Sequence, residues 1–170
     1  GALPCYFETP FGYHGAASAN GLAADRPVSI DLGNIGSLLF AGYDTTRNQL
    51  GIGLFLFTQR PAQWRLLAEQ PALAPKAVEE ILRFQGVVGV APRVAYEPLT
   101  IGNYDVPAGT MVSLSTASAN HDPAVHTDPE RFDITVDREP PLTFGGGPHY
   151  CLGANLARAE MQEALVVLAG

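Results

Sequence analysis

The stretch Phe144-Gly-Gly-Gly-Pro-His-Tyr-Cys-Leu-Gly153 decides how the rest of this chain is interpreted. Its cysteine, Cys151, follows a loop with three glycines and precedes a segment from Leu152 to Leu168 that is expected to be a helix. Backbone N–H groups and the positive end of a helix favour the thiolate form of a nearby cysteine, which is the form that binds a metal. A lone cysteine is more often a small core residue, but three glycines pack a core poorly and suit close approach to a large, flat group. The loop is therefore a candidate metal site with Cys151 as its ligand.

This loop resembles the cysteine loop of the cytochrome P450 haem-thiolate enzymes, whose pattern is Phe-x-x-Gly-x-His/Arg-x-Cys-x-Gly. The residues that fill the pattern are Phe144, Gly147, His149, Cys151 and Gly153. The resemblance implies that Cys151 is the axial ligand of haem b, and that its thiolate pushes electron density onto the iron. It also implies that Phe144 and the loop amides, with Gly145 among them, shield the sulfur, and that His149 reaches a haem propionate.

Composition restricts the class of protein and its partners. The 170 residues are 46% hydrophobic and 16% charged, which is typical of one globular domain. The net charge of −7 argues against nucleic acid as a partner. If Cys151 is a ligand, the other cysteine, Cys5, has no disulfide partner, so we expect a reducing cytoplasm. No signal peptide stands at the start, and no uncharged apolar run reaches the roughly 18 residues of a membrane span.

The resemblance covers only part of the family's catalytic domain, which is much longer than this chain. Residues 29–170 match its C-terminal, haem-binding part, and residues 1–28 form a lead that aligns with nothing in the family. We therefore expect the chain to be a fragment or a truncated form.

A long helix is predicted from about Ser29 to Arg60, because Pro27 and Ser29 are start signals and Pro61 is a stop. Its middle reads Ala41-Gly-Tyr-Asp-Thr-Thr46. The Thr45 hydroxyl can bond back to the carbonyl of Ala41, which would loosen the helix and make room for a small ligand.

Polar residues on a helix usually face water, but this segment resembles the family's Ala/Gly-Gly-x-Asp/Glu-Thr oxygen groove. The resemblance implies that Ala41 and Gly42 lie against the haem. It also implies that Asp44 and Thr45 deliver protons to bound O2.

Three further features carry the resemblance. Glu80-Ile-Leu-Arg83 on a helix from Pro75 to Phe84 resembles the family's Glu-x-x-Arg pair, and Arg131 of Pro129-Glu-Arg-Phe132 is expected to complete a buried ionic network. Arg93 is expected to pair with a haem propionate, the alternative being an ordinary surface arginine. The apolar residues 86–91 before it would line the substrate cavity.

The remaining elements are short. We predict a helix near 61–69, a hairpin of strands 99–101 and 104–106, a strand at 111–115 and a short helix at 116–120. His121 and His126 are expected in solvent. Arg158, on the last helix, is a candidate contact for an acidic electron donor, although a solvated helix face explains it nearly as well.

The fold class is therefore mainly α with small β-hairpins, corresponding to the C-terminal portion of the cytochrome P450 fold. The implied activity is haem-dependent insertion of one oxygen atom of O2 into a small apolar organic substrate. Electrons would come from a ferredoxin or a flavoprotein reductase, with no nucleic acid or membrane involved. Two alternatives stay open: a non-catalytic haem-binding or partner-binding fragment, and a peroxygenase. The peroxygenase is disfavoured because it would not need Asp44 and Thr45.

Overall fold

The fold is that of a computed structural model, which describes residues 32–170. The predictions that fall on the lead at 1–28, on Cys5 and on the first residues of the long helix lie outside these described residues. Five α-helices are present in the described part: α1 (Leu32–Thr58), α2 (Pro61–Glu69), α3 (Ala74–Phe84), α4 (Thr116–Ala119) and α5 (Ala154–Ala169). Four strands accompany them: β1 (Val90–Val94), β2 (Leu99–Ile101), β3 (Tyr104–Val106) and β4 (Met111–Ser115). Short 3₁₀ helices occupy Pro71–Leu73, Leu142–Phe144 and Gly147–His149.

The helix boundaries follow the sequence signals closely. α1 ends at Thr58, and α2 starts at Pro61 with Arg60 as its N-cap residue. Proline fits the first helical position because its missing N–H has no helical partner there. The Arg60 N–H instead bonds to the carbonyl of Phe57 at 2.9 Å, which turns the chain sharply between the two helices. The predicted helices over 61–69 and 75–84 are confirmed.

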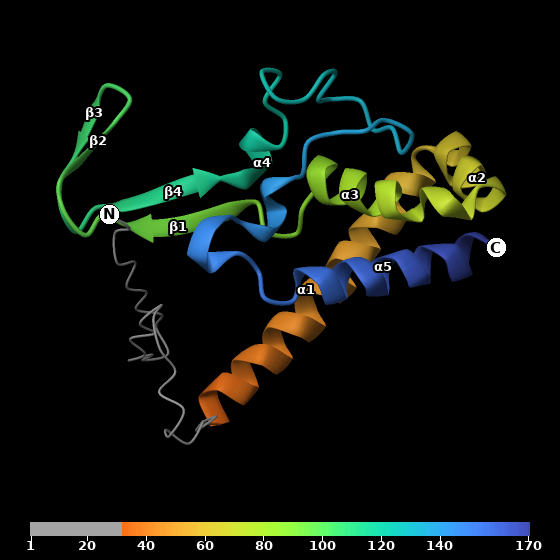
Figure 1. The fold of residues 1–170 in the computed structure, drawn as a ribbon, viewed down its shortest axis with the longest axis horizontal. Helices are drawn as coiled ribbons and strands as arrows, with labels where there is room; N and C mark the ends of the chain where they lie inside the picture. The colour runs from red at the N-terminus through yellow and green to blue at the C-terminus, as the bar shows by residue number, and fades with distance from the viewer. Residues whose placement is uncertain (1–31) are drawn as a thin grey trace.

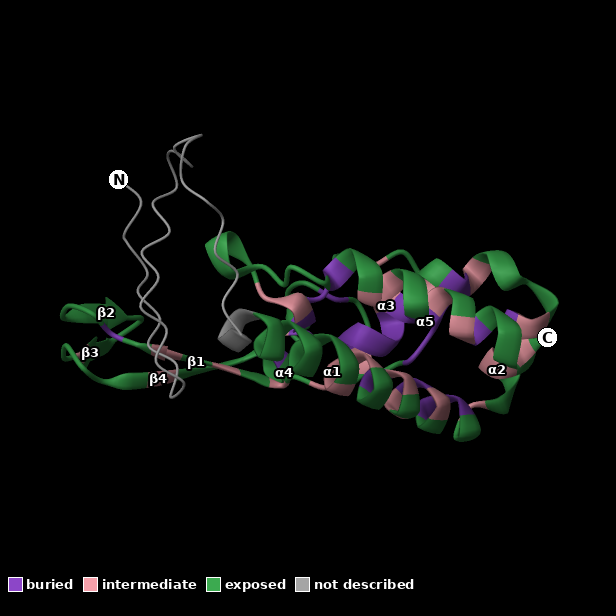
Figure 2. Ribbon diagram, turned by 90° about the horizontal axis from the view of Figure 1, so that it is seen from below, coloured by how far each residue is buried: buried purple, intermediate pink, exposed green. Residues whose placement is uncertain are grey.

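The hydrophobic core lies where α1, α2, α3 and α5 meet, and Figure 2 shows buried residues gathered there. α3 contributes most to it, because one of its faces is entirely apolar and its other faces carry charge. The buried core residues are Leu56, Phe57, Leu67, Ala74, Ala77, Val78, Ile81, Leu82, Phe132, Ile134, Met161 and Leu165.

The N-terminal half of α1 contrasts with this core. It projects away from the other helices (Figure 1), and its large apolar side chains are exposed in the described structure. These side chains are Ile35, Leu38, Leu39, Phe40 and Tyr43. The C-terminal half of the same helix supplies Leu56 and Phe57 to the core, so the two halves have different environments.

The strands form two separate antiparallel pairs that extend from the helical body (Figure 1). β2 pairs with β3 as predicted, in the register Leu99↔Val106. β4 pairs with β1, a strand that the sequence did not predict, and places Arg93 opposite Val112. Pro92 obscured this strand, since proline lacks a ladder donor and is tolerated only where a strand has an open edge. A two-stranded pair has such an edge.

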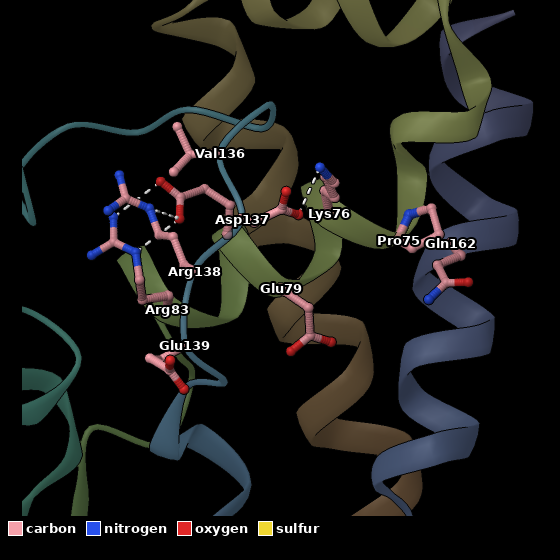
Figure 3. Close-up of a pocket in the computed structure, with 10 residues that line it drawn as sticks. Pro75, Lys76, Glu79, Arg83, Val136, Asp137, Arg138, Glu139 and Gln162 are labelled. Atoms are coloured by element: carbon pink, nitrogen blue, oxygen red, sulfur yellow. Dashed lines mark hydrogen bonds and ion pairs between the residues drawn. The ribbon is translucent and has the colours of Figure 1, made fainter. Parts of the chain in front are cut away.

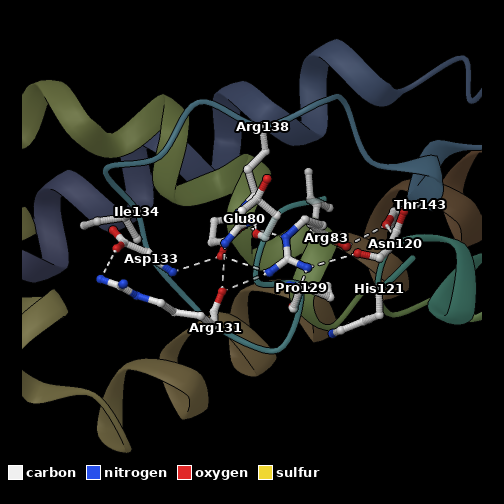
Figure 4. A network of polar contacts seen from close by, with 12 residues as sticks. Glu80, Arg83, Asn120, His121, Pro129, Arg131, Asp133, Ile134, Arg138 and Thr143 are labelled. Carbon is white, nitrogen blue, oxygen red and sulfur yellow. Dashed lines mark hydrogen bonds and ion pairs between the residues drawn. The ribbon is translucent and has the colours of Figure 1, made fainter. Parts of the chain in front are cut away.

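A buried ionic network joins α3 to the segment before the cysteine loop (Figure 4). Arg83 donates two hydrogen bonds to the Glu80 carboxylate, at 2.8 and 3.0 Å, and both side chains are almost fully buried. Arg83 also donates to the backbone carbonyls of Asn120 and Pro129. The predicted Glu80–Arg83 pair is confirmed, and it holds the returning chain against α3.

The third member of the network is Arg138, and the prediction of Arg131 was wrong. Arg138 Nε lies 3.0 Å from Glu80 Oε2, with 9% of its side chain exposed. The Arg131 side chain is 68% exposed and pairs with Asp133. Arg131 contributes its backbone carbonyl, which accepts hydrogen bonds from Arg83 and Arg138. The local turn therefore directs the Arg131 carbonyl toward the guanidinium groups of Arg83 and Arg138, while the Arg131 guanidinium points to Asp133.

His126 was expected in solvent and is instead buried, with 4% of its surface exposed. Its backbone N–H bonds to the carbonyl of Asp122, in a tight turn that folds the ring inward. Burial lowers the pKa of His126 below its ordinary value of 6.5, and the positive charges of Arg83 and Arg138 lower it further. The ring is thus held neutral beside the network.

Candidate cofactor site

The cysteine loop is built from two 3₁₀ turns that precede α5. Gly145 and Gly147 have φ values of 74° and 65°, in the left-handed region that side chains avoid, so the reversal requires glycine at both positions. The Cys151 N–H donates to the carbonyl of Phe144 at 2.9 Å and closes the loop. The Cys151 thiol is unpaired and exposed.

Helix α5 begins directly after this loop, at Ala154, with Gly153 as its N-cap residue. The Ala154 N–H donates to the carbonyl of Cys151 at 3.3 Å. The prediction of a helix following the cysteine is confirmed, with its start two residues later than expected. Cys151 therefore stands at the positive end of a 16-residue helix.

A hollow of about 310 Å³ lies between the loop and strand β1. Its walls are the apolar start of β1, two threonines, the loop and two side chains that can carry positive charge. The lining residues are Val88, Val90, Ala91, Pro92, Arg93, Thr116, Thr143, Phe144, Gly145 and His149. Four of the predicted cofactor residues, Arg93, Phe144, Gly145 and His149, thus meet at one hollow. One guanidinium hydrogen bond of Arg93 goes to the carbonyl of Pro92 at 2.8 Å.

The polar segment of α1 is not among the residues that line this hollow. The Thr45 hydroxyl donates to the Ala41 carbonyl at 2.6 Å, as predicted. The helix nevertheless continues without interruption from Leu32 to Thr58, so the expected opening is not present. Asp44 forms an ion pair with Arg47 at 2.9 Å, and Gly42 is exposed.

Two polar residues that the sequence did not indicate, Gln49 and Thr143, hold together the segments around the site. Gln49 of α1 is buried, donates to the carbonyl of Gln85 and accepts from the N–H of Val87 at 2.6 Å. Thr143 accepts a hydrogen bond from Asn120 and donates to the Leu82 carbonyl at 2.6 Å. Gln49 ends the polar run at 44–49 and directly precedes the apolar half of α1, and this was the available signal, because an amide that is buried in a core requires hydrogen-bond partners.

Arg158 is engaged by its neighbours and is not a free surface cation. It forms a bidentate pair with Glu79 of α3, and its Nη1 donates to the Tyr150 hydroxyl at 2.9 Å. Its guanidinium lies 4.6 Å from the centre of the Phe144 ring. The hydrogen bonds to Glu79 hold the pKa of Arg158 above its ordinary value, with the Tyr150 hydroxyl adding to the effect. The prediction that Arg158 contacts an electron donor stays untested, but its charge is already paired.

The chemistry of the donor set tests whether a haem fits these residues. The described residues contain no group of three or more His, Cys, Asp or Glu side chains that could hold a metal ion. A porphyrin brings its own nitrogen ligands, so a single thiolate such as that of Cys151 is sufficient to hold its iron. The hollow beside the loop offers apolar walls together with Arg93 and His149, which suit the carboxylates of such a group. The arrangement fits haem, with Cys151 as the candidate thiolate ligand, on a mainly helical fold.

Comparison with known proteins gives the family. The family model for cytochrome P450 matches residues 32–168. The chain belongs to the cytochrome P450 family, whose members bind haem b through a cysteine thiolate. Of the helices in residues 32–170, none combines the length and apolar character needed to cross a membrane.

The relatives are bacterial enzymes, and the match covers part of each. The chain is 47% identical to luteothin monooxygenase of Streptomyces thioluteus over 79% of this chain and 34% of that protein. It is 44% identical to nocardicin C N-oxygenase of Nocardia uniformis over 85% of this chain and 37% of that protein. The crystal structure of CalO2 superposes with a TM-score of 0.76 and 32% identity, over 78% of this chain and 34% of CalO2. The chain spans about a third of the length of the curated relatives it matches.

Proposed function

We propose that the protein is a haem-thiolate monooxygenase. It inserts one atom of O2 into an organic substrate, while two electrons and two protons convert the other atom to water. The observation that carries this proposal is an exposed thiol, Cys151, on a glycine loop that also borders the hollow shared by Arg93 and His149. Membership of a family whose relatives include a monooxygenase and an N-oxygenase supports it.

The residues of the loop and of β1 divide the binding of haem between them. Cys151 is proposed as the residue that would bind the haem iron, and Arg93 and His149 as the partners of the haem carboxylates. Phe144 and Gly145 would cover the sulfur side of the group, with Gly153 leaving the start of α5 free of a side chain. Bound haem supplies the reductive activation of O2, which a thiolate ligand promotes by donating electron density to the iron.

The polar segment of α1 is proposed to deliver protons to bound O2. The Thr45 hydroxyl donates one hydrogen bond to the Ala41 carbonyl, and its oxygen can accept a hydrogen bond from a donor such as water. Asp44 has 41% of its side chain exposed, so it can exchange protons with solvent while Arg47 orients it. Ala41 and Gly42 add little bulk beside them, which leaves space for a small ligand at this helix face.

The substrate is proposed to be a small, mainly apolar organic molecule. Val88, Val90 and Ala91 give the hollow an apolar wall. Luteothin monooxygenase and nocardicin C N-oxygenase are each named for a compound, which supports an organic molecule as the substrate. A ferredoxin or a flavoprotein reductase as electron donor, and a cytoplasmic location, are part of the same proposal.

The ligand assignment is tested by spectroscopy of the reduced protein with carbon monoxide. Cys151→Ser should abolish the absorbance band that is typical of thiolate ligation, because a neutral hydroxyl cannot replace the thiolate. Cys5→Ser is the matched control and should retain the band. A Cys151→Ser protein that keeps the band would disprove the assignment, and a wild-type protein without the band would favour a fragment that binds no haem.

The proton assignment is tested by coupling, measured as product formed per reduced nicotinamide consumed, alongside hydrogen peroxide. Thr45→Ala should continue to consume electrons but release them as peroxide, and Asp44→Asn should slow O2 consumption itself. Loss of one positioned proton donor typically costs roughly 10²–10⁴-fold in rate. Thr46→Ala, one residue further along α1, is the control. Full coupling in Thr45→Ala with a genuine substrate would contradict the proposed role.

A further inference from the structure

Arg158 connects three separate parts of the molecule through one side chain. It lies on α5, one turn after the helix begins, and pairs with Glu79 on α3. The same guanidinium donates to the Tyr150 hydroxyl and lies over the face of Phe144. Tyr150 and Phe144 both belong to the cysteine loop, so Arg158 ties this loop to two helices of the core.

Glu79 is available for this contact because it faces away from the buried network. Figure 3 shows the Glu79 carboxylate pointing away from the guanidinium groups of Arg83 and Arg138. Consecutive helical residues point about 100° apart, so Glu80 enters the network while its neighbour Glu79 meets α5. Glu79 Oε2 accepts from Arg158 Nη2 at 3.1 Å, and Oε1 accepts from Nε.

We propose that Arg158, held by Glu79, is a positioning residue that fixes Phe144 and Tyr150 and thereby sets the place of the Cys151 sulfur. This inference rests on the proposed function, in which Cys151 binds haem. It assigns Arg158 to the loop and not to the surface that meets an electron donor.

The loop is stabilised by such an anchor because ordering its glycines is entropically costly. Two of its glycines have left-handed φ values, and glycine loses more conformational freedom on ordering than any other residue. The Cys151 N–H bonds to the Phe144 carbonyl, so the position of Phe144 is passed directly to the cysteine. Tyr150 precedes Cys151 in the chain, and fixing its hydroxyl restricts the same peptide group.

Arginine is the residue type that can make these contacts together. Its planar fork binds a carboxylate with two hydrogen bonds, has a further donor for the Tyr150 hydroxyl, and stacks its flat face on an aromatic ring. A lysine at the same position can pair with Glu79 as a point charge, but cannot reach all three groups. With 21% of its side chain exposed, Arg158 is also partly shielded from water, which strengthens its contacts.

The experiment compares haem-loaded wild-type protein with Arg158→Met and Arg158→Lys. Two quantities are measured: the rate of haem transfer to an excess of haem-scavenging globin, and the fraction of the reduced carbon monoxide complex with the thiolate band. Loss of a side chain that orients a metal ligand typically costs ~10–100-fold in metal affinity. We expect roughly 10-fold faster haem transfer and a reduced thiolate fraction in Arg158→Met, with only partial rescue in Arg158→Lys. Arg65→Met, which removes an exposed arginine of α2, is the control and should match the wild type.

The double variant Arg158→Glu/Glu79→Arg separates positioning from simple pairing. It keeps the α3–α5 ion pair but places a carboxylate against the Phe144 ring, whose face repels negative charge. The proposal requires this variant to fold and yet to lose the thiolate band, even if Arg158→Met fails to fold. Retention of the band in the double variant, or wild-type behaviour of Arg158→Met, would overturn the positioning role alone. Absence of the band from the wild type would overturn the proposed function, and this inference with it.

Discussion

Two adjacent glutamates of α3 serve regions of the molecule that differ in burial and in purpose. Glu80 has 3% of its side chain exposed and lies between two buried arginines, Arg83 and Arg138. Glu79 has 37% exposed and holds Arg158 at the edge of the cysteine loop. The Glu80 region holds the segment before the cysteine loop against α3. The Glu79 region connects α3 to the loop that is proposed to bind haem.

The difference has a clear energetic consequence. A buried charge that loses a partner has no water to replace it, so breaking the Glu80 network is costly. Water can partly replace a lost partner at Glu79, so breaking that pair costs little stability. We therefore expect the Glu80 region to govern unfolding and the Glu79 region to govern the properties of the cysteine loop.

The largest effect is expected from Arg83→Met. This change removes both hydrogen bonds from Arg83 to the Glu80 carboxylate, and it also removes the donor to the carbonyls of Asn120 and Pro129. Removing one member of a buried ion pair typically costs about 3–5 kcal/mol. Urea titration gives the loss in free energy of unfolding, and a loss below about 1 kcal/mol would show that the Glu80 network does not govern the stability of the fold.

The next effect separates Arg138 from Arg131. Arg138→Met should cost about 3 kcal/mol, less than Arg83→Met because Glu80 keeps its two hydrogen bonds to Arg83. Arg131→Met is the matched control, and since that side chain is mostly exposed it should cost less than about 1 kcal/mol. The same urea titration compares the two, and equal losses would contradict the assignment of Arg138 to the network.

A smaller effect is expected from pH, through His126. Its pKa in the folded protein is lowered by burial and by Arg83 and Arg138, so the folded state binds its proton less readily than the unfolded state does. The stability contributed by the neutral ring is complete above the unfolded pKa of 6.5 and is lost as the pH falls from there toward the folded pKa. The slope in this window reaches at most about 1.4 kcal/mol per pH unit. His126→Phe should flatten the pH dependence of the unfolding free energy just below pH 6.5, measured by urea titration, and an unchanged slope would contradict the burial of His126.

The smallest effect on stability is expected from Glu79→Gln. The amide keeps one acceptor for Arg158 but loses the charge, and exposure limits the cost to roughly 0.2–1 kcal/mol. The rate of haem transfer should nevertheless rise in this variant, because Arg158 is held less firmly over Phe144. A large loss of stability together with an unchanged rate of haem transfer would contradict the expectation that Glu79 acts on the cysteine loop and not on unfolding.

Much of the fold was predictable because the signals are local. Proline at the start of α2, the apolar face of α3 and the turn between β2 and β3 depend on residues close together in the chain. Strand β1 was missed because its partner, β4, lies 17 residues further on, and Pro92 argued against a strand. The buried Glu80–Arg83 pair was predicted from its resemblance to the family's Glu-x-x-Arg pattern, because the i, i+3 spacing alone indicates only an ordinary surface pair.

The candidate site shows the same difference between features that depend on neighbouring residues and features that depend on distant ones. The order of Phe144, His149 and Cys151 identified the loop through its resemblance to the family pattern, which is contained within ten consecutive residues. The sequence could not decide which arginine reaches Glu80, whether His126 is buried, or that Arg158 is engaged by Glu79 and Tyr150.

The sequence by itself therefore determined the helices, three of the four strands, the loop and the thiol that lies on it. The tertiary structure decided which charges are buried together, because a side chain's partner depends on the direction in which a distant turn presents it. Arg131 and Arg138 are both near enough in sequence to complete the network, and the turn between them points a carbonyl inward at one position and a guanidinium at the other.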